Sequence, residues 1–212
     1  MQLTKFTHSC VRFDDGDRSL VIDPGMFSEV DEALDGVDTV LITHEHPDHL
    51  EVERVTAAAR RNSRMRIWAP ASVGALLDEL RDRVVAVTAG ETFEAGGFEV
   101  RTFGGQHAVI HPTIPVVPNV GFLIGGVYHP GDSLIVPPAE VKAVFVPIGA
   151  PWANAAQLVD FAVSVRAAKT FPAHEATTSP AGAGIVESHI ARVGGQFGSE
   201  FVHLDTGTVV DV

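Results

Sequence analysis

The sequence has few cysteines and few basic residues, and each shortage excludes a class of protein. Cys10 is the only cysteine, so neither an intrachain disulfide nor a zinc site built from several thiolates can form. Lysine and arginine total 15 against 27 aspartates and glutamates, which gives a formal net charge of −12. Such an acidic surface repels nucleic-acid phosphates, so a nucleic-acid partner is not expected.

Long apolar runs are also missing. Because no segment of 18 or more apolar residues occurs, no membrane span is expected. The first residues lack an apolar signal segment, which favours a cytoplasmic location. A chain of 212 residues that is 45% hydrophobic predicts one globular domain over residues 1–212, and this composition allows for a homo-oligomer.

The apolar pattern predicts short strands that alternate with helices. Strands are expected at 2–7, 10–13, 19–22, 38–43, 66–69, 84–87, 98–103, 120–124, 127–129, 144–146 and 170–173. Helices are expected at 51–61, 70–80, 154–165 and 184–193, with a closing hairpin of strands 201–204 and 208–210. Two packed sheets with helices on both outer faces satisfy this α/β pattern, and a doubly wound sheet fits it equally well.

Histidine is abundant, with ten residues, and one segment concentrates it. Three imidazoles and the carboxylate of Asp48 occur within the six residues 44–49, directly after a buried strand. The alternation of side chains at a strand end directs His44 and His46 to the same side, and Asp48 and His49 then turn toward the same point. Imidazole and carboxylate ligands suit zinc, and also manganese, iron or nickel. The segment therefore predicts a metal site.

Segment 44–49 resembles the H-x-H-x-D-H motif of the metallo-β-lactamase superfamily. Further matches follow in the same chain order, at 20–25, His107, 128–132 and 172–174. Segments 6–10 and 144–149 are similar to the small metal-dependent hydrolases of the ascorbate-6-phosphate-lactonase-like branch. The resemblance implies a four-layer αββα sandwich, with the site along one edge of the two sheets.

The resemblance also implies a dinuclear centre with two divalent transition metals, Zn²⁺ being the expected ion. One metal would be held by His44, His46 and His107, the second by Asp48, His49 and His174, and Asp132 would bridge them. A hydroxide shared by the two metals would attack the substrate. Asp48 would be the catalytic residue that orients this hydroxide and passes a proton to the leaving group. The implied reaction is hydrolysis of a small ester, lactone, amide or phosphodiester.

Two other functions stay open on the same fold. One is a di-iron redox protein, although no flavodoxin-like partner domain is attached. The other is a phosphodiesterase or nuclease that acts on nucleic acid, which the acidic charge disfavours.

Four further residues are candidates for contacts around the site. His8 is either a contact to a ligand or substrate, or a core histidine. Asp23 is a buried carboxylate that needs a partner, and orienting a ligand histidine would supply one. His111 either faces the substrate or lies in a solvated loop. The proline-rich segment 110–118 predicts a stiff apolar wall to which Trp152 adds, and this wall favours uncharged, partly apolar substrates.

Overall fold

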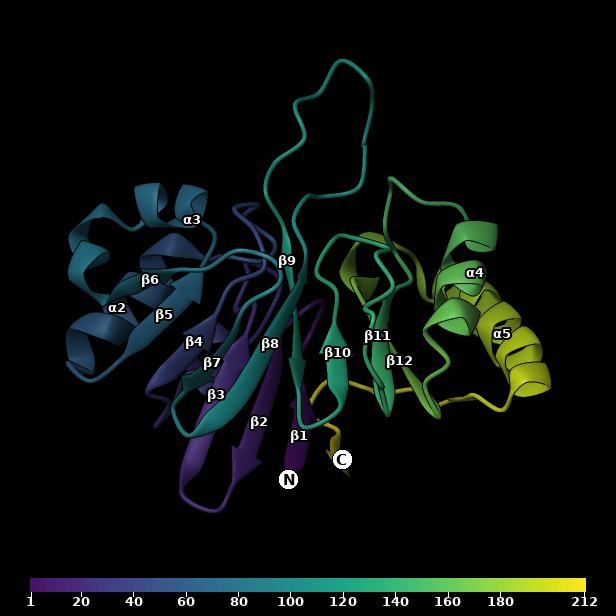
Figure 1. The fold of residues 1–212 in the computed structure, drawn as a ribbon, viewed down its shortest axis with the longest axis horizontal. Coiled ribbons are helices and arrows are strands. Elements are labelled where there is room, and N and C mark those ends of the chain that lie inside the picture. The colour runs from purple at the N-terminus through teal and green to yellow at the C-terminus, as the bar shows by residue number, and fades with distance from the viewer.

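Two seven-stranded sheets face each other in the computed structural model, which describes all 212 residues (Figure 1). The first sheet has the order β14-β1-β2-β3-β4-β5-β6. Its pairing is antiparallel from β14 to β3 and parallel from β3 to β6. The strands are β1 (Gln2–Lys5), β2 (Val11–Asp15), β3 (Arg18–Ile22), β4 (Thr39–Leu41), β5 (Arg66–Ala69), β6 (Val84–Ala86) and β14 (Val209–Asp211).

The second sheet repeats this arrangement in the order β13-β12-β11-β10-β9-β8-β7. It is parallel from β13 to β10 and antiparallel from β10 to β7. The strands are β7 (Thr92–Ala95), β8 (Phe98–Gly104), β9 (Val120–Ile124), β10 (Val127–His129), β11 (Ala143–Pro147), β12 (Lys169–Ala173) and β13 (Glu200–Phe201). Each half of the chain thus contributes most of one sheet.

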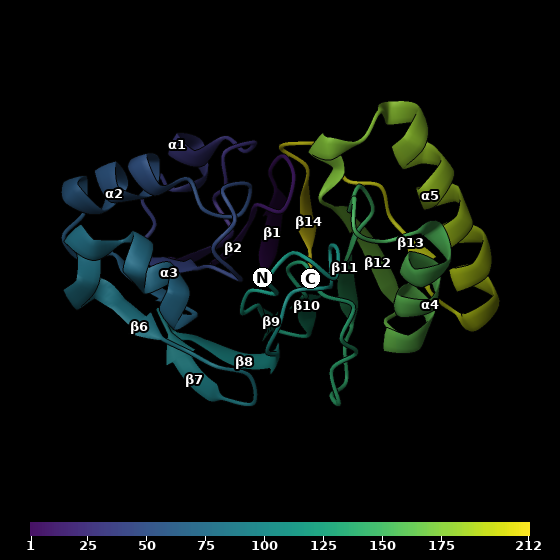
Figure 2. The same cartoon turned by 90° about the horizontal axis from the view of Figure 1, so that it is seen from above.

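Helices cover the outer face of each sheet (Figure 2). Against the first sheet lie α1 (Val30–Ala33), α2 (Val52–Arg61) and α3 (Ala71–Leu76), and against the second lie α4 (Ala155–Val165) and α5 (Pro180–Gly194). In α4, Leu158, Phe161 and Val165 form a buried stripe, and Asn154 and Gln157 form a capping box at its start. None of the helices has the length and apolar character needed to cross a bilayer.

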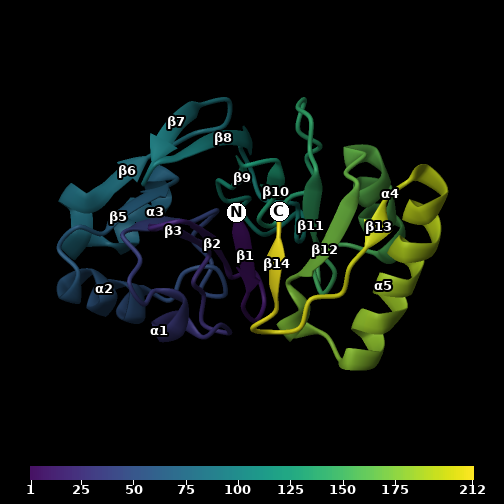
Figure 3. The same ribbon diagram turned by 90° about the horizontal axis from the view of Figure 1, so that it is seen from below.

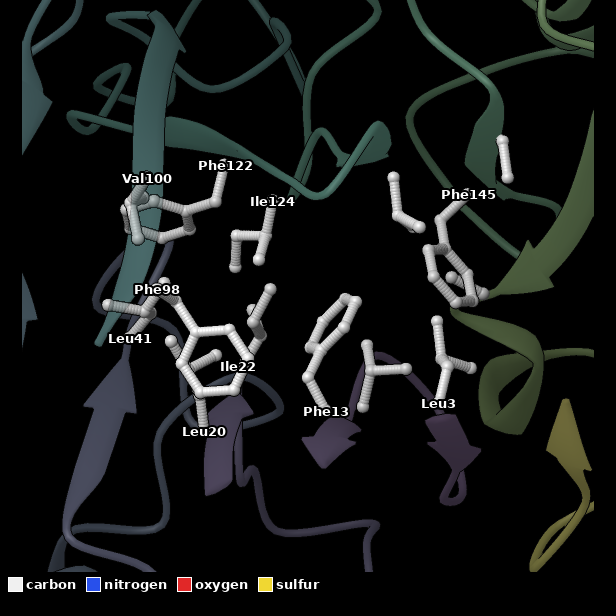
Figure 4. Packing of buried hydrophobic residues seen from close by; sticks show 14 of the residues in the cluster. Leu3, Phe13, Leu20, Ile22, Leu41, Phe98, Val100, Phe122, Ile124 and Phe145 are labelled. Atoms are coloured by element: carbon white, nitrogen blue, oxygen red, sulfur yellow. The ribbon is translucent and has the colours of Figure 1, made fainter. Parts of the chain in front are cut away.

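The core between the sheets is formed by side chains that alternate inward along both of them (Figure 4). Phe13 from β2, Phe122 from β9 and Phe145 from β11 are fully buried there. Removing one such side chain from water contributes about 1.5–3 kcal/mol. Separate buried clusters join each sheet to its helices. The predicted four-layer αββα sandwich is therefore confirmed.

The predicted closing hairpin is wrong. β13 pairs with β12 in the second sheet, and β14 pairs with β1 in the first. The turn over residues 205–207 does form, with the amide of Gly207 donating to Lys5 O and the amide of Thr208 donating to Asp205 O. Each strand pairs with the free edge of a different sheet. This pairing supplies hydrogen-bond partners for its backbone, so the two strands do not pair with each other. As a result the two termini lie side by side (Figure 3).

The helix predicted at 70–80 is shorter than expected. It ends at Leu76, and a 3₁₀ helix at Asp78–Arg83 follows. Leu77 and Leu80 are both buried, and the three-residue repeat of a 3₁₀ helix keeps them on one face. This tighter turn carries the chain directly into β6.

Candidate metal centre

The predicted ligands follow strands that end at the same edge of the sandwich, the upper edge in Figure 1. Five different connections contribute to it, after β1, β4, β8, β10 and β12. In chain order they carry His8, the 44–49 segment, His107, Asp132 and His174. Residues far apart in the sequence therefore meet at one end of the molecule.

Two groups of ligand-type side chains form at this edge. In each group the candidate ligand atoms all lie within 4.8 Å of one another. One group contains His44, His46, His107 and Asp132, and the other contains His8, Asp48, His49 and His174. The structure thus brings together all seven predicted ligands, and His8 with them.

Asp132 lies between the two groups. Its Oδ2 is 3.2 Å from Nε2 of His107 in the first group and 3.2 Å from Nε2 of His174 in the second. Its Oδ1 is 3.1 Å from Nε2 of His49. Only 3% of this side chain is exposed. This is the position that a carboxylate shared by two metals requires.

In two candidate ligand imidazoles, the outer nitrogen, which is the ring nitrogen that points away from the centre, lies beside a hydrogen-bond acceptor of the protein. Nδ1 of His49 lies 2.7 Å from Oδ2 of Asp23, which also accepts from the Thr43 hydroxyl at 2.7 Å. Nδ1 of His107 lies 2.6 Å from the carbonyl oxygen of Ala108. Both Nδ1 atoms must carry the hydrogen, so each neutral ring presents the lone pair of Nε2 to the centre. Asp23 thus contacts the imidazole of His49, one of the predicted ligands.

These lone pairs face carboxylate oxygens, which is unfavourable without a cation between them. Nε2 of His49 and Oδ1 of Asp132 are both buried and form no hydrogen bond. A metal ion would satisfy both atoms at once, and imidazole with carboxylate is a donor set that Zn²⁺ accepts. The residues present therefore fit a bound metal.

In the absence of metal, protons balance the charge of this centre. Burial lowers the pKa of His174, but hydrogen bonds with Asp132 and Asp48 outweigh it and raise the pKa to about 9. Burial also lowers the pKa of His49, yet the charges of Asp132 and Asp23 hold it well above its usual value. Conversely, burial raises the pKa of Asp132, and the charge of His49 brings it well below the usual range.

The stability of the metal-free protein should therefore fall at alkaline pH. The folded pKa of His174 lies above its unfolded value of 6.5, so its contribution is complete below pH 6.5 and lost as pH rises through about 9. We expect a loss on the order of 2 kcal/mol in the free energy of unfolding between pH 7 and 9.5. Denaturation after chelation measures it, and the zinc-loaded protein is the control that should not show it. A metal-free protein that gained stability over this range would contradict the assignment.

The backbone around the centre is unusually constrained. Four non-glycine residues have positive φ, and three of them, His8, Asp23 and His174, belong to this site. Gly25 packs so closely on the loop that carries Asp48 that a Cβ at position 25 would lie 1.8 Å from the carbonyl oxygen of Asp48. Gly149 packs in the same way on the carbonyl of His174. Such strained geometry concentrates where function fixes the backbone.

An ion pair between a buried lysine and a partly exposed glutamate lies behind the second group. The Nζ atom of Lys5 is 2.8 Å from Oε1 of Glu175, and 1% of the Lys5 side chain is exposed. The same oxygen accepts the amide of His8 at 2.7 Å. The amide of His174 in turn donates to the carbonyl of His8 at 3.2 Å. These contacts join the connection after β1 to the connection after β12.

Some contacts were not foreseen from the sequence. The indole N–H of Trp152 donates to Oδ2 of Asp132 at 3.0 Å, although an apolar role was expected for it. Asn119 accepts the amide of Asp132 at 3.0 Å and donates to the carbonyl of Pro130 at 2.9 Å. An asparagine at a strand start gives no sequence signal for this role, because its partners lie in another connection.

Replacing Trp152 by phenylalanine should separate its two roles, because phenylalanine keeps an aromatic face and removes the N–H donor. We expect the affinity for metal to fall about tenfold, since Asp132 loses a partner that orients it. Isothermal titration of Zn²⁺ into the metal-free variant measures this. Unchanged metal affinity would show that Trp152 acts only through its aromatic face.

His111 is not part of the centre. It is exposed, and its Nδ1 contacts only Thr113 of the same loop, at 2.8 Å. This loop, residues 105–119, projects beyond the sheets between β8 and β9 (Figure 1). These contacts fit a histidine in a solvated loop better than a histidine that faces the substrate.

Comparison with known proteins identifies the family. The Beta-lactamase superfamily domain matches residues 2–174. The chain belongs to the metallo-β-lactamase superfamily. Its sequence is 38% identical over 199 residues to Protein Rv0786c of Mycobacterium tuberculosis, covering 91% of this chain and 92% of that protein. It is 29% identical over 174 residues to a UPF0173 metal-dependent hydrolase of Xanthobacter autotrophicus, covering 70% and 72% of the two chains.

Solved structures share this fold. Igni18, a novel metallo hydrolase from Ignicoccus hospitalis, superposes with a TM-score of 0.73 at 20% identity, covering 99% of this chain and 97% of its own. The family, these relatives and the two ligand groups together support a metal-dependent hydrolase.

Proposed function

We propose that this metallo-β-lactamase superfamily member is a dinuclear metal-dependent hydrolase. The observation that carries the proposal is the position of Asp132, which lies 3.2 Å from a histidine of each ligand group. His44, His46 and His107 would hold one divalent metal, and Asp48, His49 and His174 the other. Zn²⁺ suits these donors best, and Mn²⁺, Fe²⁺ or Ni²⁺ would also be accepted.

A pair of divalent ions held by these residues would lower the pKa of water toward neutrality and would polarise the oxygen of the bond under attack. The chain itself must then move a proton, and Asp48 is the carboxylate placed to do so. Its side chain is 21% exposed, whereas that of Asp132 is 3% exposed. Asp48 can therefore accept a proton from the attacking water and return it to the leaving group. No serine or cysteine nucleophile is required.

The surroundings of the centre favour substrates with apolar groups. Several of the large exposed apolar side chains lie in connections at this edge, namely Met26, Phe27, Val109, Ile110, Ile114, Val116, Ile135 and Val136. The ring of Phe27 is 5.2 Å from that of His8. Residues 108–120 contain no aspartate, glutamate, lysine or arginine, and His111 is the only side chain there that can carry a charge. We infer a small, uncharged or singly charged ester or lactone rather than a sugar phosphate, because apolar contact contributes about 25 cal/mol per Å².

Hydrolysis of a matched pair of substrates tests this function. The zinc-loaded protein should hydrolyse a neutral alkyl ester with a higher kcat/KM than its phosphorylated analogue, and the metal-free protein should hydrolyse neither. Ile114→Ser should raise KM for the neutral ester, whereas Ile185→Ser on α5, also an exposed isoleucine but outside these connections, should not. Preference for the phosphorylated compound would contradict the substrate class. Absence of hydrolysis with both ions bound would count against the hydrolase.

The two alternative functions predict other results in the same assays. A di-iron redox protein would bind iron and show redox activity without hydrolysis. A nuclease would cleave a phosphodiester or RNA in preference to the ester. The cytoplasmic location and a homo-oligomeric state remain predictions of the sequence.

A further inference from the structure

His8 is the one histidine of the two groups that the seven-ligand set does not use. It is fully buried in the connection after β1, with a φ of 67°. Its Nε2 lies 3.1 Å from Oδ2 of Asp48, and its ring centroid lies 4.0 Å from that of His174. A histidine in this place could either bind the second metal as an additional ligand or hold the carboxylate of Asp48.

The outer nitrogens distinguish His8 from three of the five ligand histidines. Nδ1 of His44 lies 3.0 Å from the Thr43 hydroxyl, Nδ1 of His49 lies 2.7 Å from Asp23, and Nδ1 of His107 lies 2.6 Å from a carbonyl oxygen. Nδ1 of His8 is also buried, but it has no partner. If Nε2 of His8 bound a metal, the hydrogen would sit on Nδ1 as a buried and unsatisfied donor. The other tautomer leaves only a lone pair unpartnered.

We propose that His8 is a positioning residue, which donates its Nε2–H to Asp48 and fixes the direction of that carboxylate. This role rests on the proposed hydrolase, in which Asp48 both binds the second metal and moves a proton. The donor supplied by His8 is neutral, so it holds Asp48 without removing the negative charge that a metal ligand needs.

The backbone contacts of His8 make it a rigid support. Its amide donates to Oε1 of Glu175 at 2.7 Å, and its carbonyl accepts the amide of His174 at 3.2 Å. Glu175 is itself held by the buried Lys5 at 2.8 Å. The backbone of His8 is therefore held on one side by Glu175 and on the other by His174 of the second ligand group, which fixes the position of its ring.

Two substitutions of His8 separate positioning from metal ligation. Glutamine can place an amide N–H near the position of Nε2, so His8→Gln keeps a donor to Asp48 but is a poor metal ligand. His8→Ala removes both properties, and His189→Ala is the matched control because His189 is an exposed histidine on α5, outside the centre. Co²⁺ is titrated into each metal-free protein, and its absorption spectrum and stoichiometry are recorded together with kcat and KM for the neutral ester.

We expect His8→Ala to lower kcat and the affinity for the second Co²⁺ by about 10- to 100-fold, with the first Co²⁺ unaffected. His8→Gln should stay near wild type in both, and its Co²⁺ spectrum should be unchanged. If His8→Gln behaved as His8→Ala and altered the spectrum, His8 would be a ligand and the proposal would be overturned. Wild-type behaviour of His8→Ala would overturn it too, because His8 would then be a core histidine.

If the His8→Ala variant does not fold, a measurement on the wild-type protein still tests the proposal. In ¹⁵N NMR of the zinc-loaded protein, Nε2 of His8 should keep its proton, whereas the coordinating nitrogens of the ligand imidazoles should not. A His8 Nε2 without a proton would overturn the positioning role. Failure of the wild-type protein to bind two ions would instead overturn the proposed function on which this role depends.

Discussion

Replacing Asp48 by alanine should reduce kcat for ester hydrolysis about 10³-fold, because the proton moved during the reaction loses its acceptor. The change should also weaken the second metal site, since Asp48 lies 3.4 Å from Nε2 of His174 and belongs to the same ligand group. Steady-state kinetics at saturating Zn²⁺, with metal content measured in parallel, would separate the two effects.

Asp160→Ala offers a matched control for this substitution. Asp160 is an exposed carboxylate on α4, away from the centre, and its removal should leave kcat unchanged. The Asp48 variant should keep the fold, because its loop is held by other contacts such as the amide of Met26 donating to Pro47 O at 2.9 Å. Full turnover by the Asp48→Ala protein would show that another group moves the proton.

Glu175→Ala should be the most destabilising change among the polar residues near the site. It would leave the ammonium of Lys5, which is 1% exposed, without its carboxylate partner 2.8 Å away. Breaking such a pair is costly because the remaining charge stays buried. We expect the free energy of unfolding to fall by about 3 kcal/mol, as measured by chemical denaturation.

The double variant Lys5→Met with Glu175→Gln is the control for this prediction. It removes both charges, and the glutamine oxygen can still accept the amide of His8. Neutral or apolar groups of similar size often replace a buried ion pair at little cost, so most of the lost stability should return. A double variant as unstable as Glu175→Ala would show that the destabilisation does not come from the unpaired charge.

The fold could be predicted largely because the motif segments occur in chain order and each lies at a strand end. The helix over 155–165 was equally clear, since its capping box and apolar stripe are both local in sequence. The closing hairpin failed for a physical reason. Strands β13 and β14 are too short to specify their own pairing. Each one pairs instead with the free edge of a different sheet.

In the centre too, some contacts follow from residues that are close in the sequence, and others depend on the tertiary structure. The proximity of His44, His46, Asp48 and His49 follows from one short segment. The contacts of Trp152 and Asn119 with Asp132 join separate connections, so no spacing in the sequence indicates them. His8 could be named as a candidate, but its role depends on which of its nitrogens finds a partner, and that requires the packed structure.

The central claim is that Asp132 is shared by two metal ions. A crystal of the zinc-loaded protein, measured at the zinc absorption edge, tests it most directly through anomalous scattering. Two peaks should lie about 3.5–4 Å apart on either side of the Asp132 carboxylate, one beside each ligand group. A single peak, or two peaks of which neither contacts Asp132, would contradict the dinuclear centre.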